Sequence, residues 1–98
     1  MNTLPFITAI KEYDEKFYEL LKSLQETIFE ESALDIKTKL MISMAVDACM
    51  GAEEGVRSIA ESLRRMGVTD AQIAEVLRIS YFAKGNMVIT ASNAAFEK

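Results

Sequence analysis

The residues that could do chemistry are few, and they gather around the segment ACMGAEEGVRSIA, residues 48–60. Cys49 is the single cysteine, Asp47 lies just before the segment, and the chain has no histidine. A thiol can attack a peroxide and a carboxylate can move a proton, but each reaction needs a neighbouring group that activates it. The sequence therefore offers two candidate catalytic residues, Cys49 and Asp47, without an evident partner for either.

Both candidates also have a structural interpretation. Cys49 lies among apolar residues, where an unpaired cysteine most often acts as a small buried hydrophobic side chain. Asp47 shares a narrow polar stripe with Lys39 and Ser43, and an ion pair with Lys39, with Arg57 or with a neighbouring subunit would account for it. We favour the structural interpretation of both residues and keep the catalytic one open.

The composition argues against metal and cofactor sites. Without histidine and with one cysteine, a zinc site would consist mainly of carboxylates, which is unusual for a structural site. The four glycines are scattered and form no phosphate-binding loop; they are Gly51, Gly55, Gly67 and Gly85. We therefore expect neither a metal nor a cofactor.

The charge pattern argues against nucleic acid and membranes as partners. The net charge is -4, and no basic stripe is present for phosphate contacts. No apolar run approaches the roughly 18 residues of a membrane span. The first residues, MNTLPFITAIKEYDEKF, lack the basic and cleavage regions of a signal peptide. Since a single cysteine fits a reducing compartment, we expect a cytoplasmic protein.

The length and hydrophobic content predict one domain, residues 1–98, that associates with itself. A chain of 98 residues buries only about 60 to 65% of its unfolded surface, which leaves a monomer close to the margin of stability. Half of the residues are nevertheless hydrophobic. A small chain of this kind exposes apolar surface, and such surface usually marks an interface. We therefore expect a homo-oligomer.

The spacing of apolar residues predicts an all-α fold of five or six helices with short joints. We expect Thr3 to cap the first helix, Gly67 to end the third, and Thr69 to form a capping box with Gln72. The expected helices are a long one from Pro5 to Ile28, then Ile36 to Met50, Glu53 to Met66, Thr69 to Ala83 and, after a break at 84–86, Met87 to Phe96.

The expected helix from Ile36 to Met50 is apolar on nearly every side. Only the stripe of Lys39, Ser43 and Asp47 interrupts its apolar circumference. A helix of this kind is normally buried on almost every side, either in the centre of a subunit or between subunits. We therefore expect it to form the heart of the core.

Four features in a fixed order connect the chain with a known family. They are a Leu-Asp-x-Lys-Thr-Lys entry at 34–39, an apolar helix ending at Gly51, a Gly-Val-Thr turn at 67–69 and the run Tyr-Phe-Ala-Lys-Gly-Asn at 81–86. Residues 34–97 thereby resemble the carboxymuconolactone decarboxylase-like family, which includes the alkylhydroperoxidase D proteins. The resemblance implies an alkylhydroperoxidase D-like fold and a hexamer built from dimers or trimers.

The resemblance also shows which chemistry is missing. Family members with peroxidase-type activity carry a Cys-x-x-Cys pair, a histidine one turn later and a distant glutamate. A helix N-terminus stabilises the first thiolate, the second thiol resolves the sulfenic acid, and the other two groups relay protons. The resemblance places these four groups at Ala52, Gly55, Ile59 and Leu40. All four are absent together, which favours a site given over to packing.

Two functions of different class stay open. The one we favour is a non-redox oligomeric protein, in effect a pseudoenzyme, that binds a small ligand or a partner. The alternative is an enzyme of the family's type that works through residues not yet identified. It would be a peroxiredoxin-type antioxidant peroxidase, linked to oxidative stress through the family, or a decarboxylase. Since the decarboxylase branch has a histidine at position 59, Ile59 departs from that reaction too.

Overall fold

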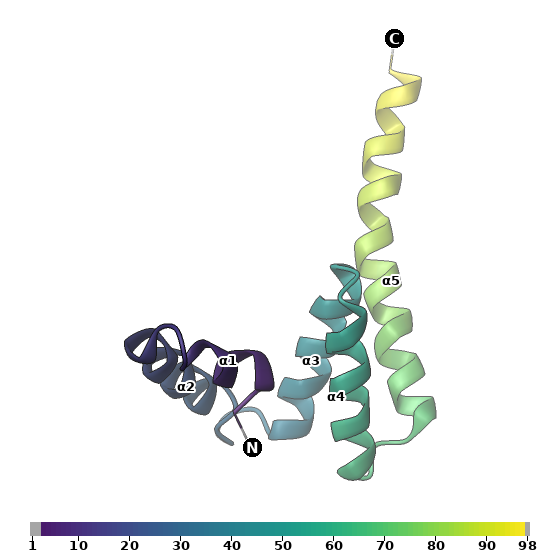
Figure 1. The fold of residues 1–98 in the computed structure, drawn as a ribbon. Coiled ribbons are helices and arrows are strands. Elements are labelled where there is room, and N and C mark those ends of the chain that lie inside the picture. The colour runs from purple at the N-terminus through teal and green to yellow at the C-terminus, as the bar shows by residue number, and fades with distance from the viewer. Residues whose placement is uncertain (1–2, 98) are drawn as a thin grey trace. The chain divides into compact units, whose positions relative to one another are not determined.

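The computed structural model describes residues 3–97, whose helices form two compact units (Figure 1). One unit ends at Ile36 and the other begins at Lys37. The first contains α1 (Pro5–Ile10) and α2 (Glu15–Ile28); the second contains α3 (Ile36–Cys49), α4 (Glu53–Arg65), α5 (Asp70–Ser92) and the 3₁₀ helix η1 (Asn93–Phe96). The all-α prediction is confirmed, because the described residues form five α-helices and no strand.

The single long helix predicted from Pro5 to Ile28 is wrong, because the chain turns between α1 and α2. Asp14 explains the break. Its Oδ1 accepts a hydrogen bond of 3.0 Å from the backbone N–H of Phe17, so it caps the N-terminus of α2. An N-cap residue has a non-helical backbone, and the chain therefore starts a new helix at this position.

The N-cap predicted at Thr3 is also wrong. α1 begins after Leu4, which makes no side-chain cap. The N–H of Leu4 donates to Oε1 of Gln25 over 3.1 Å, which ties the start of α1 to α2. Gln25 is buried together with Ile7 and Tyr18 between α1 and α2.

The second unit has its own core, to which α3, α4, the α4–α5 turn and α5 all contribute. Met44 of α3 and Leu63 of α4 are fully buried. The other buried apolar residues of this core are Leu40, Ala60, Val68 and Ile73. These residues pack α3, α4 and the first part of α5 against one another.

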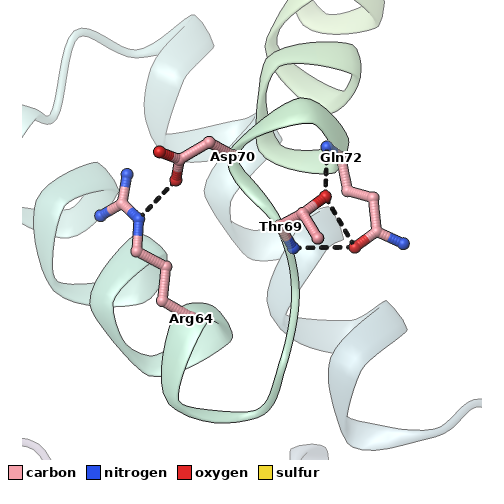
Figure 2. Close-up of polar contacts among 4 residues, drawn as sticks. All are labelled: Arg64, Thr69, Asp70 and Gln72. Atoms are coloured by element: carbon pink, nitrogen blue, oxygen red, sulfur yellow. Dashed lines mark hydrogen bonds and ion pairs between the residues drawn. The ribbon is translucent and has the colours of Figure 1, made fainter.

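The turn between α4 and α5 confirms two expectations. Gly67 follows the end of α4 with a φ of 89°, a left-handed conformation that glycine adopts readily. Thr69 and Gln72 form the predicted capping box: the Gln72 N–H donates to Thr69 Oγ1 over 3.2 Å, and the Thr69 N–H donates to Gln72 Oε1 over 2.8 Å (Figure 2). Beside it, Arg64 Nε donates to Asp70 Oδ1 over 2.8 Å.

The helix break predicted at residues 84–86 does not occur. α5 runs without interruption from Asp70 to Ser92 and passes into η1 at Asn93. A glycine inside a helix costs about 0.5–1 kcal/mol relative to alanine. That cost at Gly85 is too small to end a helix whose neighbours continue its hydrogen bonds.

α3 packs on one side only within its own unit. Leu40 and Met44 are buried, whereas Ile42, Val46 and Met50, which follow one another at four-residue steps, are exposed. The expected burial on almost every side is therefore not found inside the unit.

Among residues 3–97, no helix is long and apolar enough to cross a membrane.

Candidate functional site at the junction of α3 and α4

The junction between α3 and α4 is a tight turn held by backbone hydrogen bonds. Gly51 has a φ of 72°, the left-handed conformation that lets the chain reverse after α3. The N–H of Ala52 donates to the carbonyl oxygen of Asp47 over 2.9 Å. Ala52 is the N-cap of α4 and has no side chain that could cap it. The first position that the resemblance assigns to the thiol pair therefore stands at the very start of α4.

An open hollow of about 390 Å³ lies at this junction. Its lining combines four small or aliphatic residues with two charged ones: Ala48, Gly51, Ala52, Val56, Glu53 and Arg57. Arg57 pairs with the exposed carboxylate of Glu54, one turn earlier in α4, instead of with Asp47. Glu53 and Glu54 stand in the first turn of α4, where the positive end of the helix dipole favours negative charge.

Asp47 occupies the space beside Gly55. A Cβ atom added to Gly55 would lie 2.8 Å from Cγ of Asp47 and closer still to its Oδ2. Real Cβ atoms do not approach other atoms so closely, so any other residue at position 55 would displace the Asp47 side chain. The second position of the thiol pair therefore holds a carboxylate that belongs to α3.

The remaining two family positions carry aliphatic side chains outside the hollow. Leu40 is 3% exposed and belongs to the core of the second unit. Ile59 is partly buried on α4, next to the buried Ala60. Neither residue lines the hollow. The structure thus brings Ala52, Gly55 and Asp47 together at the junction and leaves Leu40 and Ile59 to packing.

Cys49 faces a different helix from Asp47. Its thiol donates to the backbone carbonyl oxygen of Ser80 in α5, with 3.7 Å between sulfur and oxygen. The Ser80 hydroxyl in turn donates to the carbonyl oxygen of Val76 over 2.9 Å. Asp47 contacts α4 and Cys49 contacts α5, so the two candidate catalytic residues do not form one site.

Cys49 lines a second open hollow, of about 210 Å³, between α3 and α5. The other lining residues are Ala48, Leu77, Ser80, Tyr81 and Lys84. Sequence reasoning missed the association of Lys84 and Tyr81 with Cys49. Leu77, Tyr81 and Lys84 follow one another at steps of four and three residues, which indicates one face of a helix but not which part of the chain that face meets.

Within residues 3–97, no three cysteine, aspartate or glutamate side chains are placed to hold a metal ion together. The ionisable groups that line the hollows are Glu53 and Arg57 at the first and Cys49, Tyr81 and Lys84 at the second. The Asp47 carboxylate lies beside Gly55.

Comparison with known proteins gives the chain its family. The sequence model of the Carboxymuconolactone decarboxylase family matches residues 15–98. The chain belongs to this family. The family match begins at the start of α2, so it extends beyond residues 34–97, where the resemblance was seen. The part of the chain that matches the family model therefore includes α2 as well as the second unit.

Two proteins from Methanocaldococcus jannaschii are similar to the chain over most of its length. Uncharacterized protein MJ1511 is 32% identical over 79 residues, which cover 81% of this chain and 74% of that protein. Uncharacterized protein MJ0742 is 27% identical over 91 residues, which cover 92% of this chain and 88% of that protein. No solved structure matches the chain with significance.

Proposed function

We propose that this protein is a non-redox member of the carboxymuconolactone decarboxylase family, an oligomeric cytoplasmic protein that binds a small ligand or a partner. The contact between Asp47 and Gly55 carries the proposal. The Asp47 carboxylate takes the space that the Cβ of a cysteine at position 55 would need, so a second thiol there would have to displace it.

The lost groups depend on one another, and this dependence strengthens the proposal. A peroxidatic thiol needs a base that removes its proton and a second thiol that resolves the sulfenic acid. Ala52 and Gly55 carry no reactive group, and Ile59 and Leu40 are aliphatic. Restoring one of these groups alone would not restore the reaction. The thiolate forms only after the base removes the proton, and the second thiol acts only on the sulfenic acid that the first thiol has formed.

The hollow at the α3–α4 junction supports binding. Its volume of about 390 Å³ falls in the range of roughly 300–1,000 Å³ typical of small-molecule sites. Its lining is small and aliphatic except for Glu53 and Arg57, and such isolated charged groups commonly orient a ligand. A ligand with an apolar body and a polar end fits this lining.

A second candidate function rests on Cys49. Its thiol shares the 210 Å³ hollow with the side chains of Tyr81 and Lys84. A single thiol can reduce a hydroperoxide to an alcohol and become a sulfenic acid. One external thiol then forms a mixed disulfide with release of water, and a second external thiol reduces this disulfide and restores the protein thiol. This reaction would make the protein a peroxidase-like enzyme by a route different from that of the thiol pair.

Hydroperoxide turnover separates the two functions. The wild type and Cys49→Ala are assayed with an organic hydroperoxide and an excess of a thiol reductant. We expect both proteins to consume peroxide at the rate of the reductant alone. Turnover that disappears in Cys49→Ala would establish the second candidate, and turnover that survives in Cys49→Ala would show an enzyme acting through other residues. A parallel assay of carbon dioxide release from carboxymuconolactone is expected to show no activity.

A further inference from the structure

The second half of α5 carries side chains that nothing within its own unit covers. From Tyr81 to Glu97 every residue is exposed except Gly85, which is partly buried. This part of the helix, yellow-green to yellow in Figure 1, continues past the ends of α3 and α4. No charged residue occurs between Lys84 and Glu97. A helical segment without charge is normally covered by other protein.

Apart from Lys84, which lines the hollow beside Cys49, and Ser92, the polar residues of this segment occupy one narrow strip. Asn86, Thr90 and Asn93 fall within roughly 60° of the circumference at about 100° per residue. The rest of the circumference is apolar or small. Its large exposed side chains are Tyr81, Phe82, Met87, Val88, Ile89 and Phe96.

The serine and threonine hydroxyl groups of the segment donate to backbone carbonyl groups of the helix itself. Ser92 Oγ, which lies on the apolar side, donates to the carbonyl oxygen of Val88 over 2.6 Å. Thr90 Oγ1 donates to the carbonyl oxygen of Asn86 over 3.0 Å. Covering the apolar side of residues 86–96 would therefore leave no unpaired hydroxyl donor, so the usual cost of burying polar groups is small there.

The apolar area is large enough for a stable interface. The six large side chains are between 64% and 82% exposed. Since an aromatic side chain alone presents about 150–250 Å², the six together expose roughly 900 Å². A standard stable interface buries about 800 Å² on each partner. The largest apolar patch of a typical monomer is only about 300–600 Å².

We propose that residues 81–96 form the surface through which this protein binds a second copy of itself. The inference deepens the oligomeric part of the proposed function by naming the surface. A single packed helix covers only about 100° of a neighbour, so the apolar arc requires at least two helices from the other copy or copies. The exposed stripe of Ile42, Val46 and Met50 on α3 offers a matching apolar surface on every copy.

The absence of charge favours a second copy over a different protein. Partners that meet transiently are usually selected by complementary charges around an apolar centre. Residues 85–96 carry no charge with which to select such a partner. Interfaces between identical subunits are more apolar than other interfaces, as this face is.

The test compares two glutamate substitutions on the same helix, Val88→Glu and Thr90→Glu. Val88 lies near the middle of the apolar arc and Thr90 in the polar strip, and both are exposed in the isolated chain. Sedimentation velocity at micromolar concentration measures the mass, which for the wild type should be a multiple of 10.9 kDa. We expect Val88→Glu to weaken self-association by at least about tenfold, because it places a charge in a desolvated interface. Thr90→Glu should sediment like the wild type.

A second variant protects the test against misfolding. Phe96→Ser lies in η1, away from the buried residues of the second unit, and should weaken self-association in the same direction. Circular dichroism confirms that the helices persist in all variants. A monomeric wild type would overturn both the surface and the oligomeric part of the proposed function. An oligomer that tolerates Val88→Glu and Phe96→Ser as well as Thr90→Glu would overturn the surface alone. The non-redox proposal is tested separately by the peroxide assay.

Discussion

The carboxylate of Asp47 on α3 lies where the side chain of any residue other than glycine at position 55 on α4 would be. The family resemblance places the second thiol of the peroxidase pair at the same position. A cysteine at position 55 would have to displace the Asp47 carboxylate from the place that it takes in this structure.

Leu40 tests whether the position of the family's glutamate now belongs to the core. We expect Leu40→Glu to lower the free energy of unfolding by about 3 kcal/mol or more, because it removes a packed side chain and buries an ionisable group. Leu40→Met, which keeps the volume, should cost less than about 1.5 kcal/mol. Urea denaturation at one protein concentration measures both. Equal stability of the glutamate and methionine variants would show that position 40 tolerates the family's chemistry.

Cys49 tests whether the single thiol is available for reaction. We expect iodoacetamide to label Cys49 slowly in the native protein at neutral pH and rapidly in urea, because the thiol is partly buried and donates to Ser80. Ser58→Cys in a Cys49→Ala background is the control, since Ser58 is exposed on α4. Native labelling of Cys49 as fast as that of the control would contradict its structural role.

The contacts in Figure 2 should differ in their contribution to stability. Thr69→Ala removes the capping box and is expected to cost about 1 kcal/mol, within a range of about 0.5–2. Arg64→Ala breaks the ion pair with Asp70, but both side chains are largely exposed, so little change is expected. Thermal unfolding of the two variants gives the comparison. A larger loss for Arg64→Ala than for Thr69→Ala would reverse this ranking.

The parts of the fold that depend on neighbouring residues could be predicted from the sequence. Gly67 and the pair Thr69 and Gln72 act within one turn, so their types and spacing were sufficient. The errors at Asp14 and Gly85 have another origin. At both places a free-energy difference of about 1 kcal/mol decides whether the helix continues or ends. The periodicity of apolar residues does not reveal so small a difference.

The candidate site was predictable in its residues but not in its contacts. Asp47 and Cys49 are two positions apart, so helical geometry alone directs them about 200° apart around α3. Which helix each one meets depends on tertiary packing. The contact of Asp47 with Gly55 and that of Cys49 with Ser80 join different helices, and no local pattern announces them.

A double-mutant cycle between Asp47 and Gly55 measures most directly whether the Asp47 carboxylate takes the place of a side chain at position 55. Urea denaturation is performed on the wild type, Asp47→Ala, Gly55→Ala and the double variant. With Asp47 removed, Gly55→Ala should stabilise the protein by about 0.5–1 kcal/mol, the usual gain of alanine over glycine in a helix. With Asp47 present, the gain should be lost or reversed, which gives a coupling of at least about 1 kcal/mol. If Gly55→Ala changes the free energy of unfolding equally in both backgrounds, Asp47 does not fill the position of the missing thiol. That result would contradict the proposed role of Asp47 at this junction.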